Sequence, residues 1–169
     1  MSAALLPVYL VATGLLVASA VAKLRHPQPA TEALAELGLP APRRLVRFAS
    51  LAELITAALM SARPALGAPI ACALYLSLAA LVLAQLKRGS TRSCGCLGSA
   101  ELPPTRLHAA VNLALAGSCA VARPHPLAAF HHPLAGGVVY LTAATTAWAL
   151  AAGLELLPPA LGAYRRPAA

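Results

Sequence analysis

Five long runs of apolar residues, separated by short polar segments, dominate the pattern of the chain. Each run is close to the length of about 17–25 residues that a helix needs to cross the hydrocarbon core of a bilayer. A helix is the expected conformation in each run, because lipid offers no partner to free backbone N–H and C=O groups. The fourth run is short and contains His108 and Asn112. The runs cover residues 5–22, 45–62, 66–86, 107–122 and 136–157.

This pattern predicts an all-α integral membrane protein, a helical bundle of four or five spans. At 169 residues the chain has room for one domain rather than two, so residues 1–169 are expected to form a single transmembrane helical domain. Between the first two runs, Thr31 can cap a short helix that continues to Leu37. Gly38 and Pro40 would end this helix, and its mixture of Ala, Leu and Glu suits a helix lying on the membrane surface.

The composition agrees with a lipid-facing protein and argues against a nucleic-acid-binding one. Hydrophobic residues make up 59% of the chain and charged residues 11%, whereas soluble domains carry about 25% charged residues. The net charge is +8, but Lys and Arg occur in short clusters between the apolar runs rather than along one face. Aromatic residues, which could stack on bases, make up only 4%. The expected partner is therefore the lipid bilayer and not nucleic acid.

The distribution of Lys and Arg predicts the orientation of the spans. When the segments between the five runs are taken alternately, one side carries eleven of these residues and the other carries two, Arg63 and Arg123. Basic loops tend to stay in the cytoplasm. The N-terminus is therefore expected outside the cell (inner or plasma) membrane. The loop after the third run and the C-terminus are then cytoplasmic.

The candidate chemistry lies in that loop, where Cys94 and Cys96 flank a glycine. Thiol–disulfide exchange needs a thiolate, and nearby cations favour that form. A disulfide between cysteines so close in sequence closes a small, strained ring, and strained disulfides tend to be oxidising and labile. These properties indicate a redox carrier or catalyst rather than a structural brace. Three basic residues precede the motif and could stabilise the thiolate, namely Lys87, Arg88 and Arg92.

The cysteine pair has two other interpretations. A structural zinc site needs four ligands, and His108 is the one further candidate ligand nearby in the sequence. Two soft thiolates could instead hold Cu(I), or the cysteines could be chemically idle. The sequence therefore gives no metal site that we would assign.

A second candidate thiol pair consists of Cys72 in the third run and Cys119 in the fourth. If these two spans are antiparallel neighbours, both cysteines lie at a similar depth, toward the face opposite the Cys94 motif. A helix rises about 1.5 Å per residue, so Cys72 and the motif would be about 25–30 Å apart, too far for direct exchange. Buried cysteine is also a common small apolar residue, and an unreactive role stays open.

A carboxyl group in the middle of the second run, that of Glu53, needs a partner, neutralisation or a cavity. It could accept a proton near a thiol or a quinone. It could equally be a hydrogen-bond partner of Lys23, Thr56 or a facing span, and Asn112 and His108 could join the same polar cluster. A small transporter would need a longer polar pathway than these residues provide.

A series of short motifs occurs in a distinctive order along the chain. The motifs are Ser19-Ala20-Val21-Ala22-Lys23-Leu24-Arg25-His26-Pro27, Leu37-Gly38-Leu39-Pro40, Glu53, Lys87-Arg88-Gly89 and Cys94-Gly95-Cys96-Leu97-Gly98. This series resembles the methylamine utilisation protein MauE family, within the broader DoxX-like group of small membrane proteins. The likeness covers about residues 5–122, and Leu97 stands where the family usually has Phe. It implies a four-helix transmembrane core, to which residues 136–157 add a span. It also implies that Lys23, Glu53, Cys94 and Cys96 are the matching functional positions.

The resemblance further implies a membrane thiol–disulfide oxidoreductase or electron-transfer component. Its partner would be a thioredoxin-like protein or a disulfide-containing client, in this family linked to maturation of a disulfide-rich methylamine dehydrogenase subunit. An exported client would meet the thiols outside the cell, whereas the charge pattern predicts them inside. Either the thiols take electrons from cytoplasmic thioredoxin, or the orientation is reversed.

The alternative is a non-catalytic membrane assembly or export factor whose bundle scaffolds a partner protein. Its cysteines would then be structural or idle. The sequence specifies no cofactor, although a quinone would suit a redox role. It does not define the oligomeric state or the client.

Overall fold

The computed structural model describes residues 5–39, 41–90 and 103–121, and this part of the chain is helical throughout, without strands. Each of the first four predicted spans is a helix whose ends lie within three residues of the predicted ones. The predicted fifth span at residues 136–157 lies outside the described residues. The helices are α1 (Leu5–Arg25), α2 (Gln28–Glu36), α3 (Arg43–Ala62), α4 (Pro64–Lys87) and α5 (Arg106–Val121).

Among the described helices, α1, α3 and α4 are long and apolar enough to cross a membrane. Helix α5 has 16 residues, just below the length of about 17 that a span normally needs. Large apolar side chains point outward from these helices, such as Phe48, which is 68% exposed, and Ile55, which is 61% exposed. A helix that is apolar on its outer face as well as its inner face belongs in lipid. The prediction of an all-α, multi-pass membrane protein is therefore confirmed.

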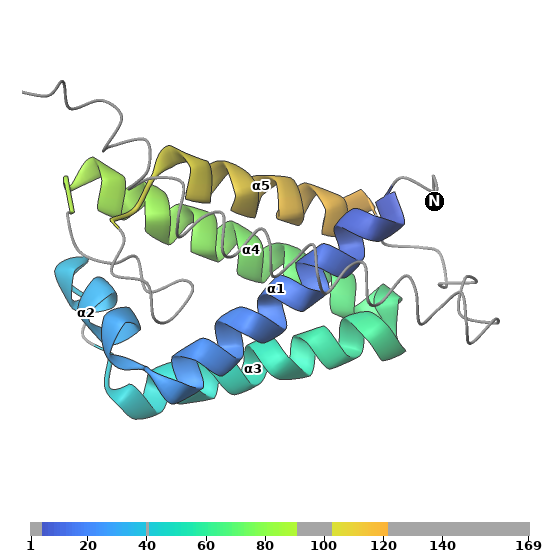
Figure 1. Ribbon diagram of the computed structural model, residues 1–169, viewed down its shortest axis with the longest axis horizontal. Helices are drawn as coiled ribbons and strands as arrows, with labels where there is room; N and C mark the ends of the chain where they lie inside the picture. Colours follow the sequence, from blue (N-terminus) through green and yellow to red (C-terminus); the bar gives the residue numbers. More distant parts are fainter. Residues whose placement is uncertain (1–4, 40, 91–102, 122–169) are drawn as a thin grey trace, which may run out of the picture.

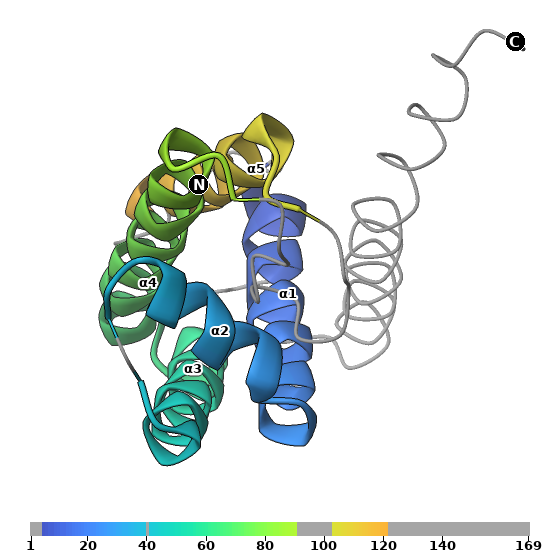
Figure 2. The ribbon, with the colours of Figure 1, turned by 90° about the vertical axis from the view of Figure 1, so that its left-hand side faces the viewer.

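The four longer helices pack side by side around a common core (Figure 1). Helix α1 contacts α3, α3 contacts α4, α4 contacts α5, and α5 returns to α1. Helices α3 and α4 are antiparallel because Arg63 is the single residue between them. The short helix α2 packs against α3 and lies across one end of this arrangement (Figure 2). We call this the α2 end of the bundle.

A glycine ends α2 at the position that the sequence predicts. Gly38 has a φ of +73°, the left-handed conformation that favours glycine. The N–H of Gly38 donates to the carbonyl of Ala35, and the N–H of Leu39 donates to that of Leu34, both at 2.9 Å. These two bonds form a Schellman motif, which satisfies carbonyls that the helix end leaves free.

The start of α2 differs from the prediction. The helix begins at Gln28, with a proline in its first turn, where the missing N–H costs no hydrogen bond. Thr31 therefore lies inside the helix, and its hydroxyl donates to the carbonyl of Gln28 at 2.7 Å. The expected helix is present, but the prediction that Thr31 caps it is wrong.

Two tyrosines tie the helices together across the core. The hydroxyl of Tyr9 in α1 donates to the carbonyl of Met60 in α3 at 3.0 Å. The hydroxyl of Tyr75 in α4 donates to the carbonyl of Ala12 in α1 at 2.5 Å. Both rings are buried, so each phenol contributes apolar area to the core while its hydroxyl group keeps a hydrogen-bond partner.

The backbones of α3 and α4 approach each other closely beside the turn between these helices. A Cβ atom added at Gly67 would lie 2.2 Å from the backbone nitrogen of Met60, which no side chain could tolerate without movement of the backbone. The absence of a side chain at Gly67 thus lets α4 fold back tightly on α3. Small residues have this role in many membrane helix pairs.

We predict that Gly67→Ala destabilises the protein by about 1–3 kcal/mol, because the added methyl group overpacks the α3–α4 contact. The matched control is Gly117→Ala in α5, where an added Cβ would meet nothing within 4 Å. Thermal unfolding of both variants in mild detergent would test this. Equal midpoints for the two variants would contradict the close approach.

Candidate functional site

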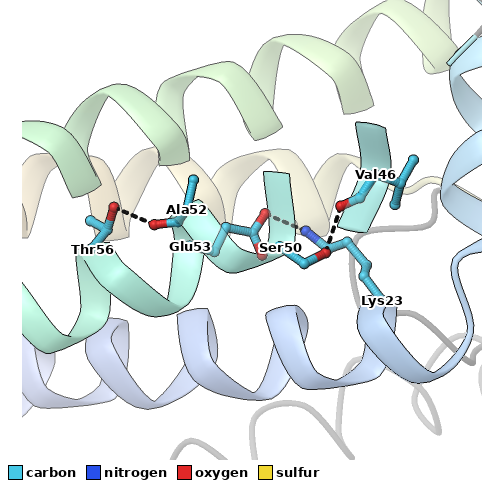
Figure 3. A network of polar contacts seen from close by, with 6 residues as sticks. All are labelled: Lys23, Val46, Ser50, Ala52, Glu53 and Thr56. Atoms are coloured by element: carbon cyan, nitrogen blue, oxygen red, sulfur yellow. Dashed lines mark hydrogen bonds and ion pairs between the residues drawn. The ribbon is translucent and has the colours of Figure 1, made fainter. Parts of the chain in front are cut away.

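A buried ion pair between α1 and α3 lies at the centre of the candidate site (Figure 3). The ammonium group of Lys23, in the last turn of α1, donates to Oε1 of Glu53, in the middle of α3. Each side chain is only 7% exposed. Two charges so far from water are stable only as a pair. Lys23 is one of the partners that the sequence offers for Glu53, and that pairing is confirmed.

The neighbouring hydroxyl groups do not join this pair. Thr56 donates to the carbonyl of Ala52, and Ser50 donates to that of Val46, each at 2.8 Å and within α3 (Figure 3). Thr56, the other partner named for Glu53, is therefore occupied by its own helix. The second carboxylate oxygen of Glu53, Oε2, is buried and has no hydrogen-bond partner among the described residues.

Gln85, which the sequence analysis did not single out, is the third buried polar group of the site. Its side chain is 1% exposed, and neither its Oε1 nor its Nε2 has a partner within the described part of the chain. Each unmade hydrogen bond of this kind costs about 1–3 kcal/mol. The sequence feature that could identify Gln85 is the same one that identifies Glu53, namely a single polar side chain within an apolar run.

These three polar side chains line a cavity of about 260 Å³. The remaining wall is apolar. Helix α2 contributes Ala30, Ala33 and Leu34 to that wall, and the connection between α2 and α3 contributes Leu37 and Ala41.

The other apolar side chains of the wall come from α3 and α4, among them Leu45 and Ala49 of α3 and Leu78 and Leu81 of α4. Leu45 is 55% exposed and Ala49 is also exposed, so the cavity reaches the surface beside the first two turns of α3. Concave, mostly apolar sites with a few convergent polar groups are typical of small-molecule binding.

The C-terminal residue of α2, Glu36, holds the chain where it leaves α4. Ser90 donates through its hydroxyl to a carboxylate oxygen of Glu36 at 2.6 Å, and the guanidinium group of Arg88 donates to the Glu36 carbonyl at 2.5 Å. Gly89, with a φ of +66°, ends α4 in a second Schellman motif, in which the Ser90 N–H donates to the Gln85 carbonyl at 3.1 Å. Helix α2 and Gln85 thus contact both the cavity and the beginning of the segment that contains Cys94.

The predicted redox motif itself lies outside the described residues, as does Arg92. Of the cations expected to favour its thiolates, Lys87 and Arg88 are described and exposed. The roles of Cys94, Cys96, Lys87, Arg88 and Arg92 therefore stay predictions.

The second candidate thiol pair lies in the core between α4 and α5. Cys119 is fully buried, Cys72 is partly buried against the same hydrophobic cluster, and both are free thiols. Both cysteines belong to the same hydrophobic cluster, and no disulfide joins them. Whether they exchange electrons stays a prediction.

His108 and Asn112 form a separate local group at the start of α5. The His108 Nδ1 atom lies 2.7 Å from the Thr105 hydroxyl, and the Asn112 amide donates to the His108 carbonyl at 2.9 Å. Neither residue lines the cavity of Glu53. Of the possibilities that the sequence leaves open for these two residues, the structure shows the local one, in which both are occupied near the start of their own helix.

The described basic residues gather at the α2 end. Helices α1 and α4 end there, and α3 and α5 begin there, whereas Arg63 lies at the opposite end. The basic residues that belong to these helix ends are Lys23, Arg25, Arg43, Arg44, Arg47, Lys87, Arg88 and Arg106.

Three apolar spans, a buried ion pair between two of them and a strongly basic end define a multi-pass helical membrane protein. Residues 1–125 match the model of the methylamine utilisation protein MauE family, and the chain belongs to that family. The resemblance seen in the motifs is thereby confirmed. No curated protein and no solved structure matches the chain.

We predict that replacing one member of the ion pair is far more damaging than replacing both. Lys23→Met or Glu53→Met should lower the free energy of unfolding by about 3–5 kcal/mol, because each leaves a buried charge without a partner. The double variant should recover most of that loss. Unfolding of the unaltered protein, the two single variants and the double variant in mixed detergents would measure these differences in stability. Lys87→Met is the exposed control, which should change stability little. A double variant as unstable as the sum of the single variants would contradict the pairing.

Proposed function

We propose that this protein is a membrane thiol–disulfide redox protein that works through Cys94 and Cys96, with a thioredoxin-like protein or a disulfide-containing client as its partner. It would act in methylamine utilisation, in the maturation of an exported enzyme. Its transmembrane part would comprise the four longer described helices and a fifth span at residues 136–157. The supporting observation is that a MauE-family chain carries the Cys-Gly-Cys motif in the segment that follows the fixed end of α4.

The anchoring of that end restricts where the thiols can act. Ser90 is held to Glu36 on α2, and Cys94 follows four residues later. Because a fully extended chain spans at most about 3.6 Å per residue, Cys94 stays within about 14 Å of Ser90. The exposed ammonium and guanidinium groups of Lys87 and Arg88 belong to the same end of α4 and would favour a thiolate.

In the proposed reaction, the thiolate of one cysteine attacks a partner disulfide and forms a mixed disulfide. The second cysteine then displaces the partner's sulfur. Cys94 and Cys96 end as a disulfide, and the partner gains two electrons and two protons as a dithiol. The reverse sequence oxidises a client. Glu53 would serve as a proton acceptor on the way, with Lys23 holding its carboxylate in position.

We predict that Cys94 and Cys96 cycle between dithiol and disulfide. In a Cys72→Ser/Cys119→Ser background, an oxidant should remove two maleimide-reactive thiols, and reduced thioredoxin should restore them. In Cys94→Ser or Cys96→Ser the remaining cysteine has no resolving partner in its own chain. If that cysteine is first converted to a mixed disulfide with a small thiol, a thioredoxin that lacks its own resolving cysteine should displace the small thiol and stay attached as a lasting mixed disulfide. Thiols that stay reduced under oxidant, with no mixed disulfide in either variant, would exclude the mechanism.

The basic character of the α2 end supports a cytoplasmic location for the motif and an external N-terminus. We predict that a membrane-impermeant maleimide labels Cys94 and Cys96 only after cell lysis, in the same background that lacks Cys72 and Cys119. Labelling of intact cells would preserve the redox chemistry but reverse the orientation, and would favour direct contact with an exported client.

The alternative function is a non-catalytic assembly or export factor whose helices scaffold a partner. Replacement of both cysteines in cells distinguishes this scaffold function from the redox function. If the Cys94→Ser/Cys96→Ser variant accumulates to the normal level and still supports formation of active methylamine dehydrogenase, the cysteines are dispensable and the scaffold function stands.

A further inference from the structure

The cavity beneath α2 contains a buried polar side chain, that of Gln85, to which the proposed thiol chemistry gives no role. Its wall is apolar except for Lys23, Glu53 and Gln85. Three atoms of the last two side chains, Glu53 Oε2 and Gln85 Oε1 and Nε2, are buried without hydrogen-bond partners among the residues described. Buried polar atoms without partners are rare in native proteins, and each needs an explanation.

The charges of the site favour an uncharged occupant. Lys23 and Glu53 already neutralise each other, and Gln85 carries no charge. A carboxylate or ammonium group entering the cavity would therefore have no opposite charge left to pair with it in an environment of low dielectric constant, which is costly. A neutral head group carries no such cost.

The free hydrogen-bonding atoms define what that head group must offer. Glu53 Oε2 and Gln85 Oε1 accept hydrogen bonds, and Gln85 Nε2 donates them. A hydroxyl group can donate to either acceptor and accept from the amide, whereas a carbonyl group can accept from the amide alone. A head group with hydroxyl groups thus satisfies more of these atoms than one with carbonyl groups only.

The apolar lining, the opening and the volume of the cavity determine which ligand tail can fit beyond the head group. The leucines at positions 34, 37, 78 and 81 line it, and the opening beside Leu45 faces outward from α3. A volume of about 260 Å³ is near the lower end of small-molecule pockets, which start at about 300 Å³. The cavity therefore accommodates a head group and the first part of an apolar tail, and the remainder would leave through the opening.

We propose that this cavity binds an uncharged, lipid-soluble molecule whose hydroxyl-bearing head group bonds to Gln85 and Glu53. Both a membrane quinol and a monoacylglycerol have this chemistry. The proposal concerns binding alone and does not depend on the redox function of Cys94 and Cys96.

The test uses the purified full-length protein in phosphatidylcholine nanodiscs, with equilibrium binding of decylubiquinol and of monodecanoylglycerol. At least one should bind saturably at one molecule per protein, and the one that binds identifies the source. Decanoate, which has a charged head on a similar chain, should bind at least tenfold more weakly.

Two variants and a matched control connect binding to the cavity. Gln85→Met removes the amide at nearly constant volume, and Ala30→Phe fills the space from α2. Each should weaken binding at least tenfold, whereas Ala35→Phe, on an exposed position of the same helix outside the cavity, should not.

Several results would overturn the proposal. They are the absence of saturable binding of either neutral ligand to the unaltered protein, equal binding of decanoate, and equal weakening by Ala35→Phe. The first two use the unaltered protein, so they decide the matter even if Gln85→Met or Ala30→Phe fails to fold.

Discussion

A helix bundle in lipid must satisfy its polar groups from within, because the surrounding solvent offers no hydrogen bonds. Several Ser and Thr side chains described here meet this constraint through a carbonyl one turn earlier in their own helix. Thr13, Ser50, Thr56 and Ser77 all donate in this way. The two buried tyrosines meet it across helices instead, and their bonds link α1 to both α3 and α4. The same constraint therefore shapes the single helices and their assembly.

Within the described part of the chain, the buried polar atoms that lack a partner are concentrated in one place. Lys23 and Glu53 satisfy each other, but one carboxylate oxygen and the whole amide of Gln85 are left over, and all three side chains line the same cavity. An apolar pair of similar volume would commonly be as stable as a buried ion pair, or more so. Stability alone is therefore a weak reason for polar groups at this position. A site that binds a polar head group is a stronger one.

The sequence predicts this fold well where one physical requirement decides the outcome. Apolar runs of spanning length must be helical in lipid, and the first four have nearly the predicted ends. A lone carboxyl group in such a run needs a partner, which made Lys23 a candidate for Glu53. The start of α2 was missed because Pro29 fits the first turn of a helix, so the helix begins before Thr31.

The rotation of the helices about their axes could not be predicted in the same way. Whether Gln85 and Glu53 face one cavity depends on tertiary contacts, such as the close approach at Gly67 and the Tyr75 bond to α1. An Ala-rich sequence has many small residues that would permit such contacts, so no single one stands out. For this reason the sequence does not single out Gln85, and it leaves open whether His108 and Asn112 lie near Glu53.

Helix α2 connects the two regions for which functions are proposed. One of its sides covers the cavity through Ala33 and Leu34, and its last residue, Glu36, binds Ser90 at the start of the segment with Cys94. It packs mainly against α3, so it is less firmly held than the helices of the core. Any ligand in the cavity touches the helix that also fixes the base of the cysteine segment. The two proposed functions therefore share one helix, and a ligand that bound more tightly to one position of α2 than to another would also change the position of Ser90.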